Sequence, residues 1–174
     1  MLDIPLPPPA APRLPPLAVA LGILGLIPFF ALGFLATLPD PTNRYLLLLL
    51  AYAAVILSFL GGVHQGFALI APAPLTSASE PVGAWHRAAH RRLLGASLVA
   101  AIAWADFALA LYLPRWIALL VMAIAFLALV IAEQKAAFHG WVPTSYMWLR
   151  WSLTLPVVLT LLAVLAVRWF GLAG

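Results

Sequence analysis

The sequence contains no cysteine and few charged residues. Of its 174 residues, 8% are charged, with nine basic and five acidic side chains. The absence of cysteine excludes disulfides, thiolate-bound metals, iron–sulfur clusters and cysteine nucleophiles. Soluble domains typically carry about 25% charged residues, so this low fraction argues against a water-soluble fold.

What charge there is leaves long apolar stretches between the charged positions. Residues 14–39, 45–79, 116–132 and 151–167 include no formally charged side chain. A helix needs about 20 predominantly apolar residues to cross a bilayer. Apolar residues also make up 66% of the chain. The sequence therefore predicts an all-α integral membrane protein with no separate soluble domain.

Prolines, glycines and turn residues divide this apolar chain into five expected transmembrane helices in one bundle. Their expected ranges are 17–38, 45–70, 81–113, 115–138 and 145–170. At about 1.5 Å per residue, the third is longer than the hydrocarbon core of about 30 Å. Its basic beginning is therefore expected to form an interfacial extension.

Residues 1–16 are rich in proline, which blocks helix formation and favours an extended conformation. We expect a solvated tail or, alternatively, an arm that lies on a neighbouring subunit.

Five crossings would place the two ends of the chain on opposite sides of the membrane. Three basic residues fall on the C-terminal side, Arg44, Arg115 and Arg168, against six on the N-terminal side: Arg13, Arg87, Arg91, Arg92, Lys135 and Arg150. The positive-inside rule then favours a cytoplasmic N-terminus and a periplasmic C-terminus. The abundance of alanine, leucine, proline and glycine suggests a GC-rich bacterial genome, and hence the bacterial cytoplasmic (inner) membrane.

A polar group at membrane depth is costly unless it finds a partner. His64, Glu133 and Arg150 are expected at the same edge of the hydrocarbon core, with Gln65 and Trp148 beside them. This candidate polar cluster is compatible with a structural clasp, with a site for a lipid or quinone head-group, or with proton transfer. Because no nucleophile or metal set accompanies it, we expect no enzyme activity and no catalytic residue.

Two further features fall inside the expected spans. Asp106 and Tyr52 have similar depths on the third and second helices, and we expect them to form an intramembrane polar pair. Gly62 and Gly66 form a small-residue stripe that would let another helix approach closely.

The basic start of the third helix combines aromatic and cationic side chains, which favours contact with anionic lipid or an acidic partner. The residues expected on this surface are Trp85, Arg87, Arg91 and Arg92.

We expect no metal, no cofactor and no nucleic-acid partner. The arginines around His86 and His90 oppose cation binding there. His64 and His139 do not fall at one depth, as ligation of haem by two histidines requires. The basic residues lie at segment ends, where they serve membrane orientation rather than nucleic-acid binding.

Several short strings occur in a characteristic order: LGLIPF at 24–29, SFLGGVH at 58–64, Asp106, and WLR at 148–150 followed by Leu153-Thr154. Together they resemble the family of small five-helix membrane proteins of bacteria and mitochondria that includes transmembrane protein 69. The resemblance spans about residues 17–160 and implies the fold and the membrane location, and it supplies no reaction.

Two classes of function remain open. The first is a non-catalytic accessory or assembly subunit of a larger respiratory or photosynthetic membrane complex, with membrane lipids and other integral subunits as partners. The alternative is a small membrane protein that binds or transports a lipid, a quinone or a small solute at the level of His64, Glu133 and Arg150. Quinone and phospholipid are the ligands considered.

Overall fold

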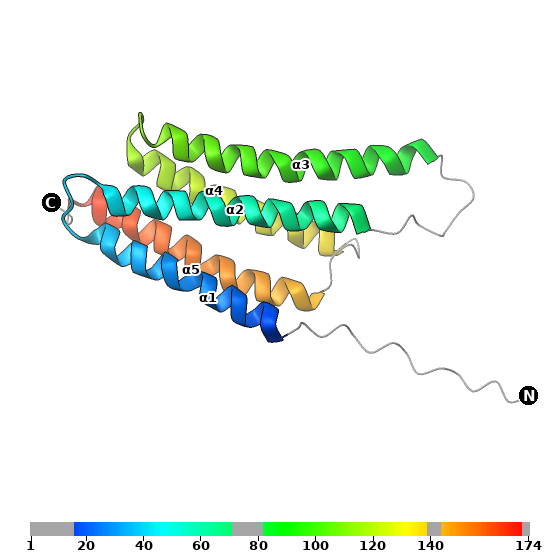
Figure 1. Cartoon of the computed structure of the whole chain (residues 1–174), viewed down its shortest axis with the longest axis horizontal. Helices are drawn as coiled ribbons and strands as arrows, with labels where there is room; N and C mark the ends of the chain where they lie inside the picture. The colour runs from blue at the N-terminus through cyan, green and yellow to red at the C-terminus, as the bar shows by residue number, and fades with distance from the viewer. Residues whose placement is uncertain (1–15, 71–81, 139–143, 172–174) are drawn as a thin grey trace, which may run out of the picture.

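The computed structural model describes residues 16–70, 82–138 and 144–171, and within these ranges the only regular elements are helices. The helices run alternately up and down in an elongated bundle (Figure 1). Their bounds are Pro16–Thr37 for α1, Arg44–Ile70 for α2, Val82–Leu109 for α3, Arg115–Phe138 for α4 and Thr144–Trp169 for α5.

The helices pack mainly against their neighbours in the chain. α1 contacts α2 and α5, while α3 lies on the opposite side against α2 and α4. α4 also packs along α5 and touches α2. This arrangement places α1, α2 and α5 around one side of the bundle, where the candidate site is found.

Four helices among the described residues are long and apolar enough to cross a membrane. Their candidate spans have mean hydropathies between 1.9 and 2.6 and cover Pro16–Thr37, Arg44–Val63, Arg115–Phe138 and Tyr146–Trp169. α3 offers only the shorter apolar stretch Leu93–Leu109. The chain is thus an all-α multi-pass membrane protein, and the fifth crossing stays a prediction.

The connection between α1 and α2 is built around Asp40. Its Oδ1 accepts hydrogen bonds from the hydroxyl and the amide of Thr42, at 2.6 and 3.0 Å, and its Oδ2 accepts one from the Tyr45 amide at 3.4 Å. The bond from the Thr42 hydroxyl is the main cause that holds the pKa of Asp40 below its ordinary value. Asn43 adopts a φ of 54°, a left-handed conformation that asparagine tolerates better than most residues.

The C-terminal end of α5 is tied to this same connection by Arg168. Its Nε and Nη2 donate to the Ala36 carbonyl at 3.1 and 2.9 Å, and its Nη1 donates to Asn43 Oδ1. The last carbonyls of a helix have no partner within the helix, so this contact satisfies one at the end of α1.

The third helix ends earlier than expected. The sequence predicts a helix to residue 113, whereas α3 ends at Leu109. Beyond it the Leu111 amide donates to the Ala108 carbonyl and the Tyr112 amide to the Leu109 carbonyl, at 3.2 and 2.9 Å. These three-residue spacings mark tight turns, which reverse the chain before Pro114, where a residue preceding proline disfavours the α conformation.

The close helix approach is also at a different place from the one expected. A Cβ added to Gly62 or Gly66 would meet nothing within 4 Å. A Cβ on Gly22 would instead lie 2.7 Å from Leu153 Cδ1, and one on Gly33 would overlap Thr160 Cγ2. Among the described residues, the glycines that let two helices approach closely are therefore those of α1 against α5. The α2 stripe makes no such approach within the described part of the chain, and a contact of this stripe with another molecule stays a prediction.

Candidate ligand-binding site

The polar centre of the molecule is an ion pair between α4 and α5. Arg150 Nε donates to Glu133 Oε2 at 2.5 Å, and the two side chains are 5% and 0% exposed. α4 presents Glu133 near its C-terminal end and α5 presents Arg150 near its start, because the two helices are antiparallel neighbours. Each buried charge is thus offset by the other.

A neutral link adjoins this pair. Trp151 Nε1 donates to Gln134 Oε1 at 3.0 Å. The ion pair and this hydrogen bond join consecutive residues of α4 to consecutive residues of α5. Together they set the register of α4 against α5. Tyr146 lies one turn before Arg150 and interacts electrostatically with Glu133 and Arg150.

A cavity of about 570 Å³ opens between α1, α2 and α5, with Phe126 of α4 behind it. Apolar side chains form most of its wall, and Arg150 and Tyr146 lie at one end. Small-molecule sites typically occupy about 300–1,000 Å³ and combine an apolar wall with few polar groups. The side chains or glycines that α1 and α2 contribute include Leu21, Gly25, Phe29, Val55, Ile56, Phe59 and Leu60.

The inner wall of the cavity is braced by aromatic contacts. The Phe29 ring lies edge-on to Tyr52 and to Phe126, with centroid separations of 5.0 and 6.0 Å. The Tyr52 hydroxyl donates to the Gly25 carbonyl at 2.9 Å and so holds α1 against α2. These contacts fix three helices around the apolar part of the cavity.

Two polar atoms at the cavity have no hydrogen-bond partner among the described residues: Arg150 Nη2 and Thr154 Oγ1. Both residues line the cavity and both are buried. Because Thr154 follows Arg150 by one helical turn, the two side chains share a face of α5. An unpartnered buried donor typically costs about 1–3 kcal/mol, so a ligand oxygen that accepts from these atoms would gain their hydrogen bonds.

The predicted polar cluster is brought together only in part. Glu133 and Arg150 are in contact, whereas Gln65 Nε2 donates to Ser97 Oγ on α3 at 2.9 Å. Trp148 is 82% exposed on the outside of α5. His64 lies on α2, but its side chain is outside the described part of the structure.

Asp106 and Tyr52 are not brought together as a pair. Tyr52 bonds to the α1 backbone, and Asp106 lines a separate cavity of about 200 Å³ between α3 and α4. Asp106 Oδ2 has no hydrogen-bond partner in the described ranges. Similar depth along two helices did not imply contact, because α3 turns this face toward α4.

The predicted surface at the start of α3 lies outside the described side chains. The backbone there is helical from Val82, but the side chains expected on this surface lie outside the described ones: Trp85, Arg87, Arg91 and Arg92. The proline-rich residues 1–15 and His139 likewise lie outside the described residues.

Sequence reasoning missed Thr154 and Tyr146 as members of the site. The available signal was the spacing of Tyr146, Arg150 and Thr154, which recur every four residues and therefore share one helix face. The part of the cavity that α1 and α2 line gave no such signal in the sequence, because apolar residues that line a cavity are of the same kind as those that face lipid.

The fold and this buried pair define an all-α multi-pass membrane protein with an apolar cavity that ends in unpartnered donors. The chain belongs to the family described as protein of unknown function (DUF3429), which matches residues 14–166. No curated protein and no solved structure was found to match it. The family description does not refer to transmembrane protein 69, so that finer resemblance stays a proposal.

Proposed function

We propose that this protein binds a neutral, largely apolar molecule with a carbonyl oxygen, of the quinone type, in the cavity between α1, α2 and α5. The observation that carries the proposal is the pair of unpartnered donors, Arg150 Nη2 and Thr154 Oγ1, at an apolar cavity of about 570 Å³. This is the second of the two classes left open by the sequence, and the geometry favours it. The protein binds the molecule and carries out no reaction on it.

The charge balance of the site favours a neutral ligand over an anion. Arg150 is already paired with Glu133 at 2.5 Å, so the pair has no net charge. An anionic ligand would bring a second negative charge close to the Glu133 carboxylate in a medium of low dielectric constant. A quinone carbonyl accepts a hydrogen bond without that penalty, and its ring and tail suit an apolar wall.

The test compares ligands that differ in one group. Purified protein in mild detergent is titrated with an n-decyl benzoquinone, with n-decylbenzene and with decanoate, and binding is followed by the rise in unfolding temperature. We expect the quinone to stabilise the protein most. Stabilisation by decanoate above that of the quinone would overturn the assignment to a neutral ligand, and equal effects of quinone and decylbenzene would overturn the role of the donors.

A matched pair of variants locates the binding. Thr154→Val removes the unpartnered hydroxyl, and Thr160→Val removes one that donates to the Pro156 carbonyl at 2.8 Å on the same helix. A neutral hydrogen bond contributes about 0.5–1.5 kcal/mol, so Thr154→Val should weaken quinone binding by a factor between about 2 and about 13. Thr160→Val should leave it unchanged. The same affinity in all three proteins would place the ligand elsewhere.

The accessory-subunit class stays the second candidate, and one observation favours it. Only 11% of the α1 span is buried within the chain, against 33–44% in the other three spans. The exposed side of α1 carries Leu17, Leu24, Ile27 and Phe34, which suit an integral subunit of a respiratory or photosynthetic complex as well as lipid. Co-purification with such a complex in mild detergent would support this role, and migration as a lone chain would count against it.

For the membrane topology we propose that α3 is the fifth crossing, with the start of α1 in the cytoplasm of a bacterium and the end of α5 in the periplasm. Support comes from the alternating helix directions, since α3 returns the chain along α2 (Figure 1), and from the distribution of basic residues. From the short sequence strings described above, we also propose that this chain is related to the family of transmembrane protein 69.

Because the chain has no cysteine, single cysteines can test this topology directly. Thr42→Cys in the α1–α2 connection and Tyr112→Cys after α3 should both react with an impermeant thiol reagent added to intact cells. Labelling of only one of the two would show that α3 does not cross.

A further inference from the structure

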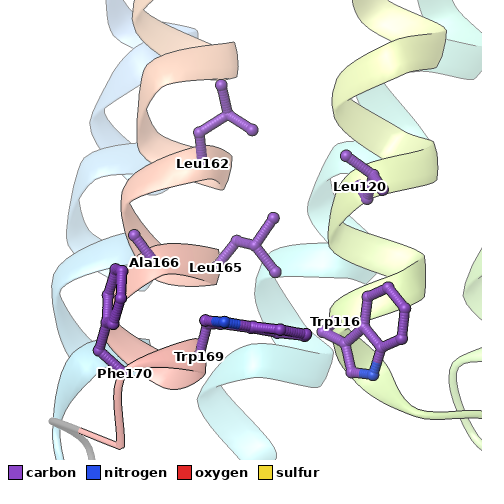
Figure 2. A pocket seen from close by; sticks show the side chains of 7 residues that line it. All are labelled: Trp116, Leu120, Leu162, Leu165, Ala166, Trp169 and Phe170. Atoms are coloured by element: carbon purple, nitrogen blue, oxygen red, sulfur yellow. The ribbon is translucent and has the colours of Figure 1, made fainter.

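The end of the bundle opposite Arg150 has its own cavity, and the proposed quinone site does not involve it. It has a volume of about 270 Å³ and lies between the start of α4 and the end of α5. Figure 2 shows the Trp169 ring projecting from α5 toward the Trp116 ring of α4, and the two centroids are 5.6 Å apart in an edge-to-face contact. The remaining lining is apolar and comprises Leu120, Leu162, Leu165, Ala166 and Phe170.

Each of these tryptophans is preceded by an arginine. α4 begins with Arg115-Trp116, and α5 ends with Arg168-Trp169. Because the two helices are antiparallel, the two pairs meet at one end of the bundle, and Arg115 and Arg168 interact electrostatically. Tryptophan is enriched at the level of the lipid headgroups, so this end of the cavity lies at that level.

The positive charges at this place are incompletely matched. Arg168 donates to the Ala36 carbonyl and to Asn43, and Asp40 is the carboxylate that interacts with it. Arg115 Nε is buried and has no hydrogen-bond partner among the described residues. Arg115 is also the first residue of α4, where the helix dipole is positive and a cation is unfavourable.

We propose that this cavity binds one anionic phospholipid, with a phosphate oxygen accepting from Arg115 and an acyl chain against the apolar lining below the Trp116 and Trp169 rings. A phosphate supplies the acceptor that the buried Nε lacks, and charge-assisted bonds of this kind are among the strong ones. Its negative charge is favourable both for the two arginines and for the N-terminus of α4. The apolar lining below the two rings suits a hydrocarbon chain and offers no polar partner to a water-soluble anion.

The experiment uses the full-length protein in detergent with three probes. These are dioctanoyl phosphatidylglycerol, dioctanoyl phosphatidylcholine with the same chains, and inorganic phosphate, and retention of bound lipid is measured by native mass spectrometry together with thermal stabilisation. We expect preferential binding of phosphatidylglycerol. Equal binding of the two lipids would overturn the role of the charge, and stabilisation by phosphate equal to that by phosphatidylglycerol would overturn the role of the acyl chain.

Two matched substitutions locate the headgroup. Arg115→Gln removes the proposed phosphate contact, and Arg44→Gln removes an arginine at the same end that is 68% exposed and already lies against Asp40 and Tyr45. One basic residue near the membrane surface contributes a factor of about five to the binding of anionic lipid. Arg115→Gln should therefore weaken phosphatidylglycerol binding about fivefold, with little change for Arg44→Gln. Equal losses in the two variants would indicate only a general attraction and would overturn the specific contact.

A third variant keeps the proposal testable if Arg115→Gln does not fold. Ala166 lines this cavity and its side chain is exposed. Ala166→Leu therefore narrows the cavity without changing any charge. We expect this variant to lose phosphatidylglycerol binding while quinone binding at the opposite end stays intact. Unchanged lipid binding in Ala166→Leu would overturn the placement of the chain.

Discussion

Glu133 and Arg150 should each destabilise the protein when the other is removed. The two side chains are 0% and 5% exposed and are joined by a hydrogen bond of 2.5 Å. Removing one partner leaves the other charge buried and uncompensated, which typically costs about 3–5 kcal/mol. Glu133→Leu and Arg150→Met should each lower the free energy of unfolding by about that amount.

The double variant separates the pair from its parts. Replacing both charges with apolar side chains of similar volume is often neutral or stabilising, so Glu133→Leu/Arg150→Met should be less destabilised than either single variant. The assay is unfolding in mixed micelles with increasing dodecyl sulfate, followed by circular dichroism. As a control, Trp151→Phe removes the neighbouring neutral bond to Gln134 and should cost about 0.5–1.5 kcal/mol.

The additivity of the two changes decides the outcome. Independent sites add within about 0.3–0.5 kcal/mol. If the double variant loses as much stability as the two single variants together, the side chains do not act as a pair and the structural argument fails.

Three further predictions concern the rest of the bundle. Gly33→Ala should cost about 1–3 kcal/mol, because the new methyl overlaps Thr160, whereas Gly62→Ala should be neutral or stabilising; equal effects in micelle unfolding would contradict the α1–α5 contact. Tyr52→Phe should cost about 0.6 kcal/mol, typical of a hydrogen bond within a membrane, and no measurable change would show that this bond does not hold α1. The pKa of Asp40 is lowered below 3.8, mainly by the hydroxyl bond from Thr42, so its contribution to stability is present above pH 4 and is lost as the pH falls through the native pKa. Asp40→Ala should show a smaller loss of stability on acidification below pH 4 than the wild type does.

The helices themselves could be predicted closely from the sequence. Residues 45–70 and 115–138 were expected to be helical, and α2 and α4 begin at Arg44 and Arg115. Such boundaries follow from local signals, namely the apolar runs and the prolines and turn residues between them. The main error, the end of α3 at Leu109, arose because the reversal before Pro114 takes several residues of tight turn.

The contacts between helices could be predicted only where charge required a partner. Glu133 and Arg150 were expected at one level from their positions along the helices, and a buried charge needs an opposite charge as its partner. Gln65 and Tyr52 could bond in several directions, and the structure pairs them with Ser97 and with the Gly25 carbonyl. A depth estimate gives the position of a residue along a helix and leaves its direction around the helix undetermined.

The sequence by itself determined that this chain is an all-α membrane protein, because sparse charge and long apolar runs act locally and need no knowledge of neighbours. Only the tertiary structure decided which faces meet. The α1–α5 approach at Gly33, the cavity beside α1 and the unpartnered donors of Arg150 and Thr154 all depend on how each helix is rotated in the bundle. That rotation is set by packing between distant residues, and a uniformly apolar helix has almost no periodic pattern from which to infer it.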